Sequence, residues 1–351
     1  MRIRTSLSVS AAVVAAWVAA GPTPTAGQGT TDIELDRFLT TQFAVRRADL
    51  ARIHRGEPFV TALPGAVDRE VAVGGIIRIN APAERTVETL RDIERFERGK
   101  GFLQTKRLSE PPRLDDFSSF HVNQEDFAAL RRCRPGDCDV KLGQSLFPIL
   151  AAINWSAPTV RDQVNALARR SAFDLLEAYR RGGNAELAIY EDSDRPTFVA
   201  REFEDLVQRT SQLPTQLPEL SRFLLDYPRV ANRTTFDDYF YWSVAEFGLK
   251  PVFRLNHMVI HQVPQPSRVR FAIATKQLYA NHYFHTALEV RATVDVAPDA
   301  GAHYLLVLTV ARSDGMTGLF GGLVKSKIQS AGRNGMLAAL NKTRQAVERA
   351  R

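Results

Sequence analysis

The chain has 351 residues, of which 44% are hydrophobic and 24% are charged, and its formal net charge is +7. These proportions are typical of globular proteins. A small positive excess spread over so long a chain gives no reason to expect nucleic acid as a partner. About 320 residues follow the N-terminal segment, which is enough for one large domain or two ordinary ones.

Residues 1–27 have the pattern of a cleavable secretion signal. Two arginines among the first four residues precede an apolar run over residues 7–20, and a stretch rich in Gly, Pro and Thr follows over residues 21–27. The run is shorter than the roughly 20 apolar residues that span a bilayer, and no later run approaches that length. Cleavage after Ala20 or Gly27 fits the pattern, and an uncleaved membrane anchor is the alternative. We therefore expect a soluble periplasmic or secreted protein.

The two cysteines, Cys133 and Cys138, flank a short turn that contains Pro135 and Gly136. Pro at the second position and Gly at the third favour a type II turn, which brings its flanking residues within disulfide distance. Such a pair should oxidise outside the cytoplasm. A redox pair usually has two residues between its cysteines, and no zinc ligands stand nearby. The sequence thus predicts a structural disulfide.

The N-terminal third combines helices with one strand. Residues 32–55 follow helical spacing, whereas residues 71–80 are typical of a strand with a glycine bend or bulge at Gly74 and Gly75. A helix should follow, with one apolar face formed by Val87, Leu90, Ile93 and Phe96.

The middle of the chain, residues 143–227, predicts a helical insertion. Apolar residues recur at helical spacing, and the pattern is interrupted at Pro148, Pro158 and Gly182. The pattern leaves the boundaries of the individual helices open.

The last third predicts an antiparallel meander and a final helix. Strands are indicated over residues 238–247, 252–263, 268–279, 283–296 and 304–310, joined by short turns. Residues 318–351 then form one long amphipathic helix, with an apolar stripe made of Val324, Ile328, Ala331, Met336, Ala339, Leu340, Thr343 and Val347. A basic amphipathic helix can also lie on an anionic bilayer, which would be a peripheral membrane contact. We favour a core role, because the meander needs a cover for its apolar face.

This order of elements resembles the START-like, or helix-grip, superfamily of lipid-transfer domains, plant pathogenesis-related proteins and polyketide cyclases. Residues 76–96 are similar to the opening strand and helix of these proteins, and residues 237–351 are similar to their meander and closing helix. The stretch 133–142 also resembles exported bacterial proteins, which adds nothing about function.

The resemblance implies an α+β fold, in which a curved antiparallel sheet wraps around the long C-terminal helix and carries a helical insertion. It divides the chain into the signal at 1–27, an N-terminal helical segment at 28–70 and a START-like domain at 71–351. It also implies a cavity between the sheet and the C-terminal helix that holds a lipid or another apolar molecule. We therefore expect an exported protein that binds such a ligand; nothing in the sequence indicates an oligomer.

Candidate ligand-binding residues are aromatic or ionisable side chains on the predicted strands. Tyr239, Tyr241 and Trp242 combine an apolar ring with a polar tip, which suits the rim of an apolar cavity, although a core strand would use the same residues. The alternative function is a cyclase- or hydrolase-like enzyme acting in the same cavity. Its acid–base or head-group-orienting residues would be His257, Tyr279 and Arg312.

The sequence contains no signature of a cofactor, a metal or a common catalytic site. It has no nucleophile elbow, no phosphate-binding glycine loop and no zinc-protease helix. On a strand, His282 and His285 would point to opposite faces, so we expect surface or turn histidines there. His257 and His261 would share a face at roughly 13 Å, too far apart for one metal. We thus expect a binding protein without a cofactor rather than an enzyme.

Overall fold

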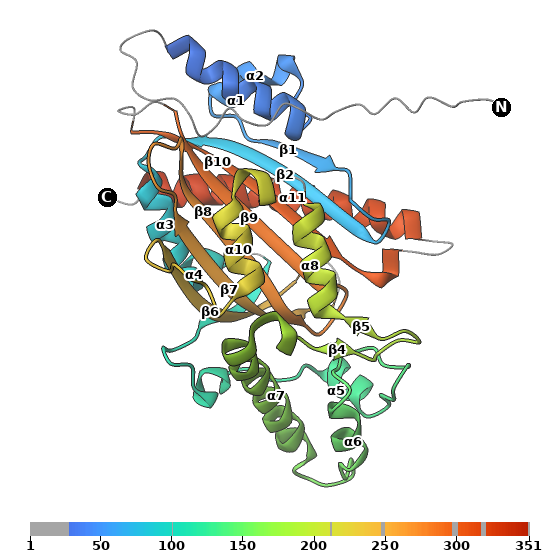
Figure 1. Ribbon diagram of the computed structural model, residues 1–351. Helices are drawn as coiled ribbons and strands as arrows, with labels where there is room; N and C mark the ends of the chain where they lie inside the picture. Colours follow the sequence, from blue (N-terminus) through green and yellow to red (C-terminus); the bar gives the residue numbers. More distant parts are fainter. Residues whose placement is uncertain are drawn as a thin grey trace, which may run out of the picture.

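The computed structural model describes residues 28–99, 101–210, 213–246, 250–296, 301–316 and 321–349. The predicted signal at 1–27 lies outside these ranges. The fold is α+β, with one large curved antiparallel sheet of eight strands and a long C-terminal helix (Figure 1). In sheet order the strands are β1 (Phe59–Leu63), β2 (Glu70–Ile79), β10 (His303–Arg312), β9 (Thr286–Asp295), β8 (Val269–Ala280), β7 (Val252–Gln262), β6 (Phe236–Ala245) and β3 (Phe102–Arg107).

One face of the sheet is gripped by the C-terminal helix. This helix, α11 (Gly321–Arg349), places Met336, Leu340 and Val347 against Val73 and Ile77 of β2, which point to the same side because they are an even number of residues apart. Two short helices, α3 (Ala83–Arg91) and α4 (Ile93–Glu97), cover the rest of this face. The predicted helix-grip arrangement is therefore present.

Helices also cover the opposite face of the sheet (Figure 1). The N-terminal helices α1 (Gln28–Gln42) and α2 (Arg47–His54) lie over β2, β10 and β9. The other helices of this face come from the middle of the chain: α5 (Gln124–Leu130), α6 (Leu146–Ala151), α7 (Val160–Gly182), α8 (Val199–Arg209), α9 (Leu213–Gln216) and α10 (Pro218–Asp226). A small hairpin of β4 (Ile189–Tyr190) and β5 (Thr197–Phe198) lies among them. Because both faces are covered, the sheet is apolar on both sides.

The glycines of β2 do not form the predicted bulge. β2 pairs with β1 and β10 in continuous register through Gly74 and Gly75. A Cβ atom at Gly75 would lie 2.8 Å from Met336, and one at Gly74 would lie 2.9 Å from Phe43. These glycines therefore allow a helix to approach the strand closely on each face.

Other differences occur where local geometry overrides the apolar pattern. The helix predicted over 32–55 is broken after Gln42, where Ala44 has a positive φ of 51°. The helix predicted after residue 82 is broken at Asp92, whose side chain caps α4 by accepting from the Arg95 amide. The edge strands β1 and β3 were not predicted. Because β1 lies within residues 28–70, this segment is not purely helical.

The buried seam of α11 is narrower than the predicted stripe. Met336, Leu340, Thr343 and Val347 are buried, whereas Ala331 and Ala339 are exposed. None of the helices in the described part of the chain is long and apolar enough to cross a membrane.

We expect the substitution Leu340→Asp to abolish cooperative folding. Leu340 is only 1% exposed, on the side of α11 that packs against β2. An unpaired carboxylate there should lower the free energy of unfolding by more than about 4 kcal/mol. The control is Leu337→Asp, three residues away on the same helix, where the side chain is 40% exposed. Thermal unfolding followed by circular dichroism should show a normal transition for the control only. A normal transition for Leu340→Asp would contradict the packing of α11 described above.

Candidate ligand cavity

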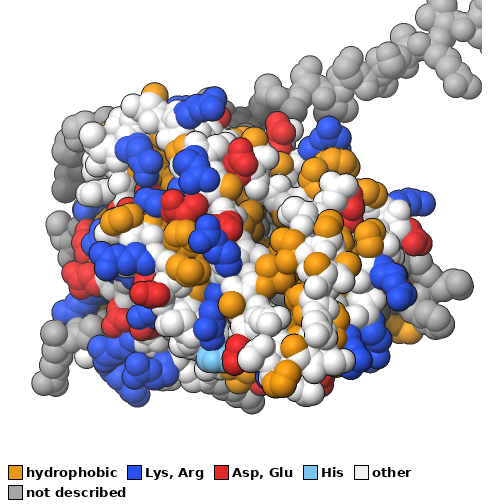
Figure 2. All heavy atoms as spheres, turned by 90° about the horizontal axis from the view of Figure 1, so that it is seen from below, with side chains coloured by type: hydrophobic (Ala, Val, Ile, Leu, Met, Phe, Trp, Pro, Cys, Tyr) orange, Lys and Arg blue, Asp and Glu red, His pale blue; other side chains and the backbone are white. Residues whose placement is uncertain are grey.

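A cavity of about 920 Å³ lies between the sheet and the middle helices, on the face opposite α11. This volume falls within the range of pockets that hold small organic ligands. Its sheet wall includes Val244, Phe253 and Tyr279, and its helical walls come from α5, α6 and α7. Figure 2 views the molecule from this end and shows hydrophobic side chains gathered around a central hollow.

Helix α7 supplies the longest apolar wall of the cavity. Its apolar side chains recur three or four residues apart, so they lie on one face of the helix; the apolar lining residues are Val164, Leu167, Ala168, Ala172, Leu175 and Ala178. Arg170, Ser171 and Asp174 of the same helix also line the cavity. Small and large residues alternate along this face. Beside the alanines the space stays open. Further along the helix, the larger side chains of Leu176 and Tyr179 are fully buried.

One end of the cavity is built from a buried hydrogen-bond network around Asp126. The carboxylate is 3% exposed and accepts hydrogen bonds from His282 Nε2 (2.8 Å), Asn281 Nδ2 (2.8 Å) and Asn123 Nδ2 (3.0 Å). Asn123 also caps α5 by accepting from the Asp126 amide. The network saturates the carboxylate, which joins α5 to the turn after β8 and gives the cavity one polar end.

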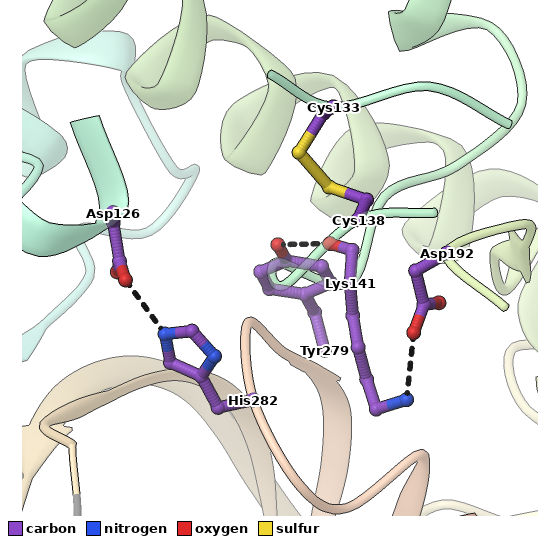
Figure 3. The surroundings of a disulfide bond; sticks show 7 residues. All are labelled: Asp126, Cys133, Cys138, Lys141, Asp192, Tyr279 and His282. Atoms are coloured by element: carbon purple, nitrogen blue, oxygen red, sulfur yellow. Dashed lines mark hydrogen bonds and ion pairs between the residues drawn. A yellow bond between two sulfur atoms is a disulfide. The ribbon is translucent and has the colours of Figure 1, made fainter. Parts of the chain in front are cut away.

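The predicted disulfide is present and supports the adjacent wall (Figure 3). Cys133 and Cys138 are bonded with their Cα atoms 4.5 Å apart, and the Asp137 amide donates to the Arg134 carbonyl across the turn. The segment after Cys138 contributes Val140 and Leu142 to the cavity.

Lys141 holds this segment against the sheet. Tyr279 Oη donates to the Lys141 carbonyl (2.7 Å), the Lys141 amide donates to the Asn281 carbonyl (2.9 Å), and Lys141 Nζ pairs with Asp192 (3.2 Å). Tyr279 is therefore the one predicted ligand-binding residue that lines this cavity, and its hydroxyl is already used to hold the wall.

The three aromatic residues predicted to share a rim lie on two faces of β6. Tyr239 and Tyr241 point toward α3 and α4, where they donate to the Leu90 carbonyl (2.6 Å) and to Glu97 (3.3 Å). Trp242 points the other way and donates from Nε1 to the Asp116 carbonyl (3.0 Å). All three are buried, which matches the core-strand alternative.

His257 belongs to a buried chain of polar groups beneath α7. Its Nε2 lies 2.9 Å from Asp238 and its Nδ1 lies 3.0 Å from Tyr179 Oη, which in turn lies 3.2 Å from Lys276 Nζ. Burial lowers the pKa of His257, although Asp238 acts in the opposite direction. Burial would raise the pKa of Asp238, but His257 and Arg233 lower it, so this side chain is a carboxylate. The Nε2–H group of His257 therefore donates to Asp238, and Nδ1 accepts from Tyr179.

Lys276 is the least expected member of this series of buried polar groups. It is fully buried and donates to Tyr179 and to Asn184 Oδ1, with its Nζ 4.0 Å from the centre of the Phe203 ring. Burial holds the pKa of this amine well below its usual 10.5. The group is a buried lysine whose neutral form is favoured by its surroundings.

Arg312 is buried in a third cluster, where β10 meets α8. Its guanidinium contacts Glu70 (2.9 Å), Glu202 (3.2 Å) and Asp205 (2.9 Å). Burial would raise the pKa of Glu202, but His285, Arg69 and Arg312 together lower it to about 2. His257, Tyr279 and Arg312 thus occupy three different clusters and form no common acid–base site.

Two histidines that we expected at the surface or in turns are buried instead. His282 is 4% exposed and bonded to Asp126, whereas His285 is 1% exposed between Glu202 (3.5 Å) and Asp314 (3.6 Å). Both histidines lie in the turn between β8 and β9, as the turn alternative predicted, but the surface alternative was wrong because both find carboxylate partners on other elements. Among the described residues, no group of three or more His, Cys, Asp or Glu side chains could hold a metal ion.

A second cavity, of about 450 Å³, lies on the same face between α1, α9, α10 and the central strands. Both cavities are therefore on the side of the sheet that faces away from α11. On the α11 side, Met336 and Leu340 pack directly onto β2.

The fold and the cavity define a class: an α+β helix-grip protein with a helical insertion that encloses an apolar cavity on the outer face of the sheet. The amino-acid sequence matches no protein-family model and no curated protein.

We expect Lys276→Met to stabilise the protein at neutral pH. Because burial lowers the pKa of Lys276, the unfolded chain keeps this proton to a higher pH than the folded chain, so wild-type stability should rise with pH between the lowered pKa and 10.5. The apolar variant should be more stable at pH 7 by about 1–4 kcal/mol, and its advantage should shrink as pH approaches 9.5.

The matched control is Lys327→Met, on the exposed side of α11. Urea unfolding of both variants and the wild type at several pH values provides the measurement. A pH-independent difference between wild type and Lys276→Met would show that Lys276 is charged in the folded state.

Proposed function

We propose that this protein is exported and binds an apolar, lipid-like molecule in the cavity beneath the helical insertion. The observation that carries the proposal is the cavity itself: its volume is about 920 Å³, its walls are mostly hydrophobic, and one end has a buried polar network around Asp126. Pockets with this composition bind ligands through apolar contact and orient them with a few polar groups.

The chemistry of the two ends indicates the kind of ligand. The apolar wall of α7 suits an acyl chain or a fused-ring body, and the exposed amide of Gln144 and the amide of Asn123 can hydrogen-bond to an uncharged head group. The carboxylate of Asp126 accepts from three side-chain donors, so it orients the amides of Asn123 and Asn281 rather than binding a cation.

Export and family membership are parts of the same proposal. The disulfide is compatible with an oxidising compartment, and the N-terminal pattern indicates a cleaved signal, which together favour the periplasm or secretion. The helix-grip fold supports a place in the START-like superfamily. In this protein the ligand would occupy the face opposite the C-terminal helix.

The substitution Ala168→Trp should block ligand binding without unfolding the protein. Ala168 is half-buried on the cavity wall, and an indole there would fill the space that the ligand needs. The control is Ala338→Trp, at an exposed position of α11. Uptake of a fluorescent fatty acid by the purified mature chain should weaken by roughly tenfold or more for Ala168→Trp only.

Mass spectrometry of the native protein should also detect a co-purified lipid in the wild type and the control. A wild-type chain that carries no lipid and takes up no fluorescent fatty acid or phospholipid would contradict the proposed function.

A further inference from the structure

The tip of the helical insertion carries the longest uncharged stretch in the chain after residue 31. Residues 142–160 contain no Asp, Glu, Lys or Arg, although such residues make up 24% of the chain. The stretch forms α6 and the loop to α7, and it lies at the end of the molecule farthest from α1 and α2 (Figure 1). A solvent-facing tip of an ordinary globular protein would carry charges.

This tip presents apolar side chains to solvent beside the cavity. Phe147 and Leu150 point inward and are buried, whereas Pro148 and Ile149 face outward, with Ile149 47% exposed. Leu103 of β3 and Ile189 of β4 are also strongly exposed, at 61% and 40%. All three exposed aliphatic residues line the same cavity, together with the exposed charged side chains of Arg170, Asp174 and Glu186, so hydrophobic surface makes up part of its mouth.

The flanking groups suit the interface between acyl chains and phosphates. Trp155 lies edge-on to Phe127, with ring centres 5.7 Å apart, and the guanidinium of Arg161 lies 4.9 Å from the centre of the Phe127 ring. Tryptophan is enriched at the depth of lipid head groups, and an exposed arginine at the end of an uncharged stretch can meet a phosphate. The tip itself is thus uncharged, and the charges that follow it are those of Arg161, which also donates to Gln124, and of Asp162.

We propose that residues 143–159 dock on the surface of a lipid bilayer and bring the mouth of the cavity to the membrane. An apolar ligand could then pass between bilayer and cavity without crossing water. The biological role of this contact rests on the proposed function, but the contact itself does not. The hydrophobic rim predicts binding to phosphatidylcholine vesicles, with a modest gain when anionic phosphatidylglycerol is added.

Flotation of the mature chain with phosphatidylcholine vesicles tests the contact. Ile149→Asp should weaken vesicle binding by about tenfold or more while the thermal transition is unchanged, because the side chain is exposed. The matched control is Leu323→Asp on α11, where an aliphatic side chain 68% exposed lies outside the proposed surface. Loss of binding in Leu323→Asp but not in Ile149→Asp would assign the membrane contact to the C-terminal helix and overturn the proposal.

Tryptophan fluorescence gives an independent readout. After cleavage of the signal the chain keeps two tryptophans, Trp155 and the fully buried Trp242, so brominated lipids should quench mainly Trp155. Unquenched emission in the presence of bound vesicles would overturn the proposal.

Ligand uptake and vesicle binding separate the two proposals. Ala168→Trp should still float with vesicles, and Ile149→Asp should still take up a fluorescent fatty acid from solution. Normal uptake by a wild-type chain that binds no vesicles would overturn the membrane contact and leave the proposed function intact. A wild-type dimer that becomes a monomer in Ile149→Asp would assign this surface to a second copy of the chain and also overturn the membrane contact.

Discussion

The close approach of α11 to β2 is the constraint on which the rest of the structure depends. At Gly75 the helix comes so near that a single additional carbon would lie 2.8 Å from Met336, and at Gly74 the opposite face of the same strand receives Phe43 with equal closeness. Two layers of helix therefore press on one strand from both sides. Because α11 packs directly on β2, little space is left for a ligand between this helix and the strand. Cavities of about 920 and 450 Å³ lie on the other face, beneath the insertion and α1.

The helical insertion covers the outer face of the sheet and also encloses the large cavity. Strands β6 to β10 are apolar on the outer face, and α7, α8 and α10 cover them in one contiguous cluster. Where the helices use large residues, as at Leu176 and Tyr179, the interface is filled. Where α7 uses Ala168 and Ala172, the interface opens into the cavity. The same helix thus packs against the sheet through some of its side chains and lines the cavity with others.

The sequence predicted those features that depend on local pattern. Strand alternation and helical spacing were sufficient for the meander, for α7 and for α11, and the Pro–Gly turn was sufficient for the disulfide. It did not predict the cavity end, because Asp126 meets Asn281 and His282 more than 150 residues later, and no local pattern encodes that meeting. The Asn123 cap three residues before Asp126 could have indicated the start of α5, but not its partner. Similarly, nothing in the strand pattern distinguished Lys276 from a solvent-facing residue, since its burial is imposed by helices that cross above β8.

The arrangement of polar groups in the cavity also determines how a ligand would lie in it. Among the hydrogen-bonding groups of the cavity, Asp126 and Asn281 are buried and Asn123 is half-buried. The exposed lining residues include the aliphatic Leu103, Ile149 and Ile189 and the charged Arg170, Asp174 and Glu186. A ligand with one polar group would therefore place that group inside and leave its apolar end toward the mouth, the reverse of its orientation in a micelle. An apolar end exposed to water would be costly, since apolar surface costs roughly 25 cal/mol for each Å² left in contact with water. Contact of the uncharged tip with a bilayer removes this cost, because the apolar end then meets acyl chains. The proposed membrane contact would thus cover the apolar end of a ligand that is bound with its polar group inside the cavity.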